Sequence, residues 1–417
     1  MLQRLCGAGV KRTLLLALSS VAPFATCGAT TPDLIYYGGP VVSHAVIVPV
    51  NWNSDVDATL QQNLPQFYAD VAQSSYWDLL ALYSTVDVTP QDALPGSGQM
   101  IARGSATAGI TITPVQCAAG VGSLAAPCTV TEADIDTELN RQLGLAQLPP
   151  PALDASGYVD TVYMLNFPPA VRVILGTAPP LSTSCVDFCN ANTTLLRNGL
   201  NMAIGVVMDY GTSACAAGCG SGSTALERAT ENASYALVDS VTDPLFGAAP
   251  SIARPLAWYD AASGQVGDYC FNQNVTNAGT ITSDVRTWSV GKFWSPQTST
   301  CMAAHYMYFS ITPSPTSVTV NQGATVPVTI QTGSFGIVQS ITLAVNSLPT
   351  GVGAAFDAPI ISDGMSTTLQ LSADHSATPG TVTVDIGARM ALPYADYEVS
   401  TITLTIRADN IFHSSFD

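Results

Sequence analysis

The segment ASYALVDSVTDPLF, residues 233–246, is the part of the chain on which the expected N-terminal fold depends most. Small and apolar residues recur at helical spacing before and within it, at Leu226, Ala229, Ala233 and Leu237. This pattern predicts a helix over residues 224–241. The helix should end at Asp243-Pro244, because proline lacks an amide hydrogen and disfavours helical geometry in the preceding residue. The apolar run AIGVVMDY, residues 203–210, predicts a buried strand before the helix.

Further segments of the same kind predict an α+β domain over residues 32–308. The apolar run at residues 45–50 and the segment YVDTVYMLNFP, residues 158–168, predict two more strands. One helix is predicted where Leu60, Leu64, Phe67, Tyr68 and Val71 share a face. Another should follow the N-cap residue Thr131, with Ile135, Leu139 and Leu143 on one side.

The sequence changes character near residue 309. Segments such as SVTVNQGATVPVTI and STTLQLSAD alternate apolar and polar residues and are separated by turn residues. Six to eight short strands without a helical pattern predict an immunoglobulin-like β-sandwich over residues 309–408. The region resembles the immunoglobulin-like modules of many exported bacterial hydrolases, which implies a spacer or stabilising cap. Adhesion or glycan binding is the alternative.

The N-terminus has the order of a secretory signal peptide, which we place at residues 1–29. Arg4, Lys11 and Arg12 precede an apolar run at residues 14–24, and small residues follow. Cys27 leaves a lipid anchor open as an alternative. No later segment is apolar and long enough to span a bilayer, so a secreted, cell-surface or periplasmic location is expected. The tail, residues 409–417, resembles sorting or processing tags of exported proteins.

Charge limits the classes of partner. The net charge is −17, and Lys292 is the one lysine beyond the leader. Nucleic acids and anionic membrane surfaces require clustered cations, so neither is an expected partner.

Eight cysteines beyond the leader form an even set: Cys117, Cys128, Cys185, Cys189, Cys215, Cys219, Cys270 and Cys301. In an exported chain an even number predicts disulfides. Cys117–Cys128 and Cys270–Cys301 are natural loop closures, and the other pairings stay open. The two Cys-x3-Cys pairs could instead hold zinc, but structural zinc sites usually use tighter spacing.

Several short segments, in order, resemble exported bacterial proteins related to the plant Exordium, or phosphate-induced, proteins. The segments are YYGGPVV (36–42), NFPPAVRV (166–173), SCVDFCNAN (184–192), ASYALVDSVTDP (233–244), AWYDAASGQVGDYC (257–270) and FWSPQTSTC (293–301). The fourth resembles that family's Ser-His-Glu-x-x-Glu-Ala-x-Thr-Asp-Pro helix. The resemblance implies a metallopeptidase-like domain in which such a helix holds zinc.

This chain departs from that motif at the positions that would carry the chemistry. Tyr235 stands in place of the ligand His, Ala236 in place of the general-base Glu, and the shorter Asp239 in place of the second ligand. Gln265 stands where a downstream Glu is expected. The remaining acids are Asp243, Asp260 and Asp268. Without imidazole or a general base, zinc is not expected, whereas calcium is compatible with oxygen ligands. Capping and turn hydrogen bonds are the ordinary role of such aspartates.

No Gly-x-Ser-x-Gly motif is present, and the four histidines, His44, His305, His375 and His413, are scattered. We therefore expect a non-catalytic pseudo-peptidase with a binding or structural role. A hydrolase or peptidase using the remaining carboxylates is the first alternative. An adhesin or glycan-binding protein is the second. The expected partner is an unidentified protein, peptide or glycan outside the cytoplasm.

Overall fold

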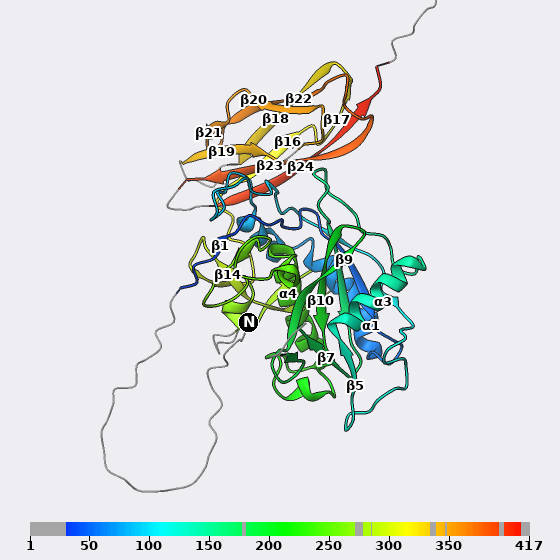
Figure 1. Cartoon of the computed structure of the whole chain (residues 1–417). Coiled ribbons are helices and arrows are strands. Elements are labelled where there is room, and N and C mark those ends of the chain that lie inside the picture. Colours follow the sequence, from blue (N-terminus) through cyan, green and yellow to red (C-terminus); the bar gives the residue numbers. More distant parts are fainter. Residues whose placement is uncertain are drawn as a thin grey trace, which may run out of the picture.

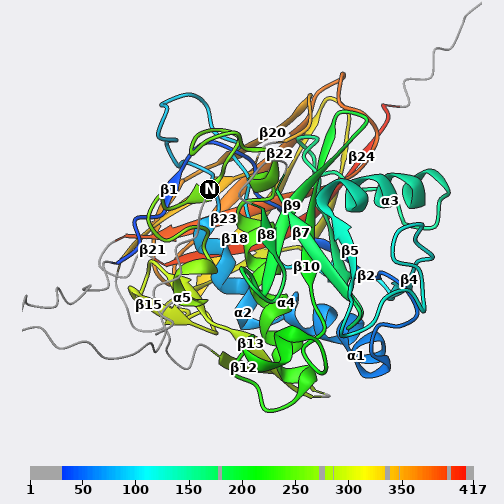
Figure 2. The same ribbon diagram turned by 60° about the horizontal axis from the view of Figure 1, so that its bottom comes forward.

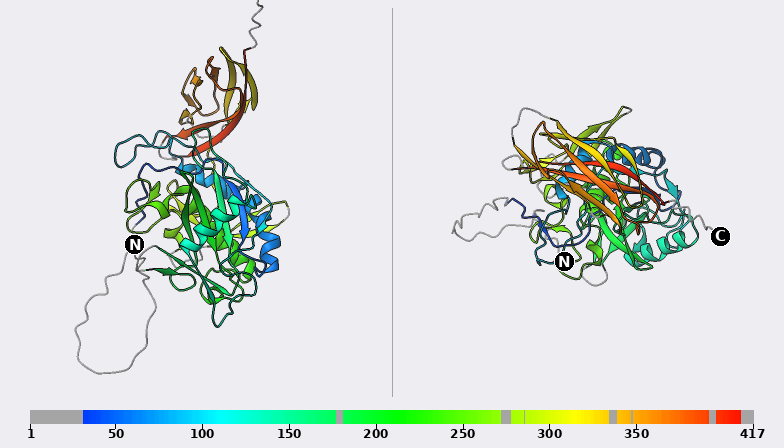
Figure 3. Two further views of the ribbon diagram at one scale, coloured as in Figure 1. Left: turned by 45° about the vertical axis from the view of Figure 1, so that its right-hand side comes forward. Right: turned by 90° about the horizontal axis from the view of Figure 1, so that it is seen from above.

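The computed structural model describes residues 31–176, 181–271, 278–284, 286–333, 339–346, 348–391 and 396–409. The expected signal peptide and all but Asp409 of the expected tail lie outside these residues. The described chain forms two bodies, an N-terminal mixed α/β body and a C-terminal β-sandwich that caps one end of it (Figures 1 and 3).

A mixed sheet forms the centre of the N-terminal body. Its strand order is β3 (Ser105–Ala106), β2 (Val46–Asn51), β6 (Thr161–Asn166), β10 (Leu200–Val207) and β9 (Asn190–Arg197), and β4 (Ile110–Thr111) also pairs with β2. All of these strands run parallel to their neighbours except β9, which is antiparallel to β10. The N-terminal body is therefore of the mixed α/β type with a mostly parallel sheet, whereas an α+β domain was expected from the sequence. α1 follows β2, α3 precedes β6 and α4 follows β10, whereas β6 to β10 succeed one another without a long helix between them.

Three long helices surround this sheet, and their beginnings follow the sequence closely. The helices are α1 (Ala58–Val71), α3 (Glu132–Gly144) and α4 (Ala225–Thr242). Thr131 and Thr224 cap α3 and α4, each in a reciprocal capping box with the acid three residues on. α1 contacts β2 and α4, whereas α3 lies beside β5 (Cys128–Thr131), β7 (Val171–Leu175) and β9 (Figure 2).

Helix α4 is buried on all sides along most of its length. One side contacts β9 and β10, and another contacts β13 (Thr287–Gly291). Every residue from Ala229 to Thr242 is buried. The sequence predicts an apolar stripe, but the helix is enclosed more completely because β13 covers the face opposite the sheet.

Short elements complete the N-terminal body. They include β1 (Ile35–Tyr36), α2 (Ser75–Asp78), η1 (Leu79–Tyr83), β8 (Ser182–Thr183), η2 (Ala214–Ala217), η3 (Phe246–Ala248), β11 (Trp258–Tyr259), α5 (Asp268–Phe271), β12 (Ala278–Thr282), β14 (Phe293–Ser295) and β15 (Thr300–Met302). β12 forms an antiparallel hairpin with β13, and β14 pairs with β15. The β12–β13 hairpin lies against α4 through β13, and Figure 2 shows these elements near the same end of the ribbon.

The C-terminal body is a sandwich of two sheets. The first has the order β16 (Ser310–Ser314), β18 (Ala324–Gly333), β22 (Ser366–Ala373), β20 (Val352–Phe356). The second has the order β17 (Ser317–Asn321), β24 (Tyr397–Arg407), β23 (Gly380–Met390), β19 (Ser340–Val345), β21 (Ile360–Ser362). Alternating Val, Ile and Leu residues from both sheets form one apolar core. The predicted immunoglobulin-like sandwich is confirmed at this level of description.

The second sheet of the sandwich packs directly on the N-terminal body (Figures 1 and 3). Strand β24 contacts η1, and Tyr397 joins the core of the N-terminal body. A Cβ at Gly387 of β23 would lie 2.1 Å from the Tyr397 hydroxyl and 2.8 Å from Met100. The two bodies therefore share a packed junction.

Four disulfides connect the eight cysteines beyond the leader. Cys117–Cys128 and Cys270–Cys301 are the expected loop closures. The two Cys-x3-Cys pairs cross-link to each other, as Cys185–Cys215 and Cys189–Cys219. This double connection fastens the loop before β9 to η2 and leaves none of the four thiols for zinc. Four disulfides indicate an oxidising, extracytoplasmic environment. Within the described part of the chain, no helix is long and apolar enough to cross a membrane.

Candidate functional site

The C-terminal half of α4 places three of the predicted site residues along one side. Tyr235, Asp239 and Asp243 are spaced four residues apart and are all buried. The loop at residues 260–267 and helix α5 pack against this side and contribute Asp268. The structure thus brings together four of the positions singled out in the sequence.

Tyr235 is enclosed by packing contacts. Its ring meets Phe271 edge to face, with 5.2 Å between ring centroids. Gly291, at the end of β13, lies against the ring so closely that a Cβ there would be 2.2 Å from a ring carbon. The Gly291 N–H also donates a 2.8 Å hydrogen bond to Ser234 on α4. The tyrosine ring therefore fills the space between the helix and β13.

Ala236 lies on a different side of α4 from Tyr235. It faces Gly205 of β10, where a Cβ would be 3.7 Å from the Ala236 methyl group. Ala236 therefore does not share the space filled by Tyr235. Adjacent positions on a helix differ by about 100° in direction, and the sheet is packed against this one.

Asp239 and Asp268 form a close acidic pair. Asp239 Oδ1 accepts a 2.7 Å hydrogen bond from the Gly267 N–H. Asp268 Oδ2 accepts a 2.9 Å hydrogen bond from the Gln265 N–H. Burial, together with the charges of Asp268 and Asp243, raises the pKa of Asp239 well above its ordinary value. Burial raises the pKa of Asp268 to about 6.

Asp243 caps the end of α4 and is fully buried. Its Oδ1 accepts a 2.8 Å hydrogen bond from the Ala257 N–H. Its Oδ2 has no hydrogen-bond partner among the described residues. Burial raises the pKa of Asp243 to about 8, so its carboxyl is largely neutral at pH 7.

Asp260 and Gln265 have roles in the adjoining loop. Asp260 accepts hydrogen bonds from Ala262 N–H, Ser263 Oγ and Asp33 N–H. Burial opposes ionisation of Asp260, but these hydrogen bonds outweigh it and lower the pKa of its carboxyl. Gln265 is buried, and its Nε2 has no partner among the described residues. Asp260 thus stabilises a turn. Its pKa is lowered, whereas the pKa values of the acids beside α4 are raised.

The group beside α4 offers oxygen donors and no imidazole. His44 and His305 lie at the junction of the two bodies, and His375 lies on the sandwich. His413 lies outside the described residues. Zinc prefers nitrogen and sulfur ligands, and a calcium site needs six to eight oxygens.

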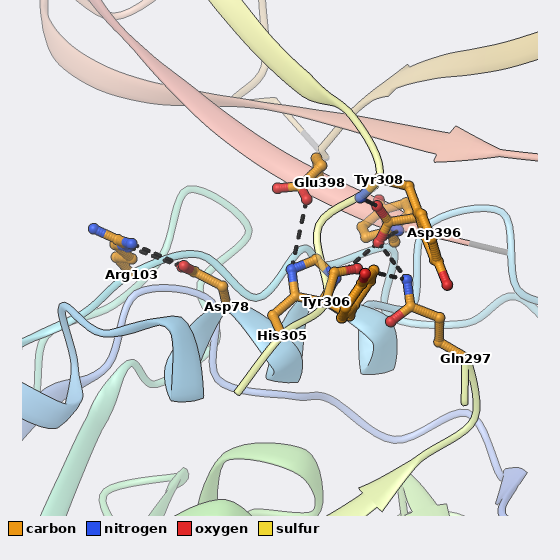
Figure 4. Close-up of polar contacts among 9 residues, drawn as sticks. Asp78, Arg103, Gln297, His305, Tyr306, Tyr308, Asp396 and Glu398 are labelled. Atoms are coloured by element: carbon orange, nitrogen blue, oxygen red, sulfur yellow. Dashed lines mark hydrogen bonds and ion pairs between the residues drawn. The ribbon is translucent and has the colours of Figure 1, made fainter. Parts of the chain in front are cut away.

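Sequence analysis missed a second polar cluster at the junction of the two bodies (Figure 4). It consists of His305, Asp396 and Glu398, whose ligand atoms lie within 4.8 Å of one another. His44 makes a separate contact across the junction, with 3.0 Å between its Nε2 and Asp385 Oδ1. No local motif signals these contacts, because each histidine lies about ninety or more residues from its acidic partners and meets them through domain packing.

The sandwich carries a shallow hollow of about 530 Å³ beside β18, β20 and β22. Its lining includes Asp374 and His375 but no Trp, Tyr or Phe. The hollow therefore offers no aromatic platform for a sugar ring, and the glycan-binding alternative gains no specific support from it.

No family model matches this chain, and no curated protein matches it. The chain is similar over 25% of its length to the periplasmic chaperone SfaE, with 15% identity, a TM-score of 0.20 and 59% of that chain covered. It is similar over 24% to the E. coli chaperone DraB, with 15% identity, a TM-score of 0.19 and 55% of that chain covered. It is similar over 24% of its length to the BIgI domain of the beta protein from S. agalactiae bound to CEACAM1, with 14% identity, a TM-score of 0.17 and 98% of that chain covered. The chain thus spans little more than half of the two chaperones. These likenesses carry no functional argument, and the resemblance to Exordium-related proteins stays a prediction from short motifs.

Proposed function

We propose that the protein is an exported, non-catalytic relative of a metallopeptidase-like family, with a binding or structural role outside the cytoplasm. The observation that carries the proposal is the packing of Tyr235 between Gly291 and Phe271. A side chain with these contacts stabilises the fold of the N-terminal body. The ligand we propose is an extracytoplasmic protein, peptide or glycan.

The chemistry of the surrounding residues supports this proposal. Metal hydrolysis requires ligands that are deprotonated and a base that removes a proton from bound water. The position of the expected base is occupied by Ala236, which packs against the sheet. Asp239, at the position of the second ligand, has a raised pKa because it is buried and lies beside Asp268. Neither residue meets the requirement at neutral pH.

The test is a search for zinc-dependent cleavage. Purified protein with intact disulfides is incubated at pH 7.5 with a broad peptide library and equimolar Zn²⁺, and products are identified by mass spectrometry. The expected result is a product set identical to that of a heat-inactivated sample. Cleavage that appears with Zn²⁺ and disappears with a chelator would overturn the proposal.

A second candidate function is hydrolysis by the acidic pair. The observation that favours it is the interaction between Asp239 and Asp268, two buried carboxyl groups whose pKa values are raised to different extents. Such a pair can provide one acid and one base. Because the pKa of Asp268 is about 6 and that of Asp239 is higher, Asp268 is ionised beside a protonated Asp239 only above about pH 6. This function therefore requires peptide cleavage above pH 6 that both Asp239→Asn and Asp268→Asn abolish. Cleavage that survives either substitution would exclude the pair.

A further inference from the structure

The junction between the two bodies contains a histidine enclosed by acidic groups (Figure 4). The backbone N–H of His305 donates a 2.8 Å hydrogen bond to Ser75 of α2, which ties this residue to the N-terminal body. Asp396 and Glu398 belong to the sandwich, immediately before and within β24. The His305 side chain is 1% exposed, and those of Asp396 and Glu398 are 0% and 12% exposed. The cluster therefore joins the two bodies in an almost dry environment.

Asp396 fixes the orientation of the His305 ring and the tautomer of its neutral form. Its Oδ1 accepts hydrogen bonds from Tyr397 N–H at 2.9 Å and from Gln297 Nε2 at 2.9 Å. Its Oδ2 accepts a 2.8 Å hydrogen bond from Tyr308 N–H. A carboxylate with these donors around it is an acceptor, so His305 Nε2, 2.7 Å from Oδ1, carries the hydrogen. In the neutral imidazole this leaves the lone pair on Nδ1.

That lone pair faces a carboxyl oxygen. His305 Nδ1 lies 3.5 Å from Glu398 Oε1, and neither atom has a hydrogen-bond partner among the described residues. Two buried acceptors that face each other repel and are both left unsatisfied. A cation between them, either a proton or a metal ion, removes this cost.

The geometry favours a metal ion. Two ligands on a tetrahedral zinc ion, each about 2.0–2.1 Å from it, lie roughly 3.3 Å apart, close to the observed separation. A metal-ligating histidine usually donates its other N–H to a carboxylate, which is the arrangement of Asp396. The ligand atoms of His305, Asp396 and Glu398 all lie within 4.8 Å of one another.

We propose that this junction is a binding site for a divalent cation of the zinc class, with His305 Nδ1 and Glu398 as ligands and Asp396 as the positioning residue. Mixed imidazole and carboxylate donors suit zinc and its neighbours better than they suit magnesium or calcium. His305 is tied to the N-terminal body and Glu398 belongs to the sandwich, so the ion would hold the two bodies together. This site is separate from α4, and the inference does not depend on the proposed function.

The first experiment measures zinc binding to the full exported chain with its disulfides intact. Chelator-treated protein is titrated with Zn²⁺ at pH 7.5 by calorimetry, and bound metal is counted after gel filtration. We expect one ion per chain in the wild type and at least tenfold weaker binding in Glu398→Gln. This substitution keeps the shape of the side chain and removes one of several clustered negative charges, so the apo protein should fold normally.

Two matched control variants test whether Zn²⁺ binds at this cluster and not at another histidine. Asp385→Asn removes the other histidine–carboxylate contact of the junction, and His375→Asn removes a surface histidine. Both variants should bind one Zn²⁺ with the affinity of the wild type. As a second readout, Co²⁺ should give a visible absorption band in the wild type and in both controls, but not in Glu398→Gln.

Three outcomes would overturn the proposal. A wild type that takes up no Zn²⁺ would show that a proton alone lies between His305 and Glu398. Equal affinity of the wild type and Glu398→Gln would place the bound ion elsewhere. Loss of binding in His375→Asn would assign it to the surface of the sandwich.

Discussion

The ring of Tyr235 is packed inside the N-terminal body. Gly291 has no side chain, and the ring of Tyr235 lies where a side chain at that position would be. The edge of Phe271 closes the other side. Tyr235 is therefore packed inside the domain, and its replacement should lower the stability of the protein.

Tyr235→His should therefore destabilise the protein without creating a peptidase. The smaller imidazole leaves part of the ring space unfilled and buries a polar group, at a cost of about 2–4 kcal/mol. Tyr235→Phe is the matched control, because it keeps the ring contacts and should cost about 1 kcal/mol. Urea unfolding of the three proteins at pH 7 measures the difference. A histidine variant no less stable than the phenylalanine variant would show that the ring is not held as described.

Asp243 makes stability depend on pH in a defined direction. Its pKa rises from 3.8 to about 8 on folding, so the folded state holds a proton that the unfolded state has lost. This favours folding fully below about pH 4, and the contribution is lost as the pH rises through 8. Over that window one proton changes the free energy of unfolding by at most about 1.4 kcal/mol per pH unit.

Asp243→Asn tests this dependence, because asparagine has the same shape and no proton to lose. The free energy of unfolding of the wild type should fall more steeply between pH 4.5 and 7.5 than that of the variant. Denaturant unfolding at pH 4.5, 6 and 7.5 gives both slopes. Equal slopes would mean that Asp243 is ionised in the folded protein throughout this range.

At the scale of the element, residues next to each other in the sequence determine where α4 begins, whereas residues far away in the sequence determine how deeply it is buried. Thr224 and Glu227 form the capping box that begins the helix. Its almost complete burial depends on β13, which approaches from a distant part of the sequence. The strand β9 was not predicted, because its segment NANTTLLR is polar at its beginning and follows a cysteine-rich loop. Pairing with β10 over eight residues compensates for that weak pattern.

The paired disulfides give a prediction at this scale. Trypsin cleaves after Arg172, Arg197 and Arg228, and so yields peptides 173–197 and 198–228. Because Cys185 bonds to Cys215 and Cys189 to Cys219, these two peptides should stay joined without reductant. Their joint mass should be four hydrogens below the sum of the reduced peptides. Two separate peptides, each with an internal disulfide, would contradict the crossed pairing.

At the scale of the whole molecule, the sequence predicts the two bodies better than it predicts how they meet. Alternating residues predict the sandwich, and helical spacing predicts α3, with its N-cap Thr131, and α4. The junction could not be predicted, since His44 meets Asp385 and His305 meets Asp396 only after both bodies have folded and packed. In the candidate site, too, one part could be predicted from the sequence and another could not. Tyr235, Asp239 and Asp243 lie together as helical spacing requires, but the contribution of Asp268 depends on the path of a loop.

The sandwich should fold without the N-terminal body. Its apolar core is contributed by its own two sheets and is separate from the larger core. Residues 309–408 expressed alone should show a strand-dominated circular dichroism spectrum and a single cooperative unfolding transition. Loss of the contacts made by Tyr397 should lower the stability but leave the transition cooperative. An unfolded product would show that the sandwich depends on the N-terminal body.

The most direct measurement is the rate of casein cleavage by the intact exported protein from pH 3 to pH 9, with Zn²⁺ present and Asp239→Asn as the control. The packing of Tyr235 and Ala236, together with the raised pKa of Asp239, predicts that both proteins stay at the rate of the protein-free blank at every pH. A wild-type rate that rises above the blank at any pH and falls in Asp239→Asn would contradict this. It would show that the side of α4 bearing Asp239 is an active site.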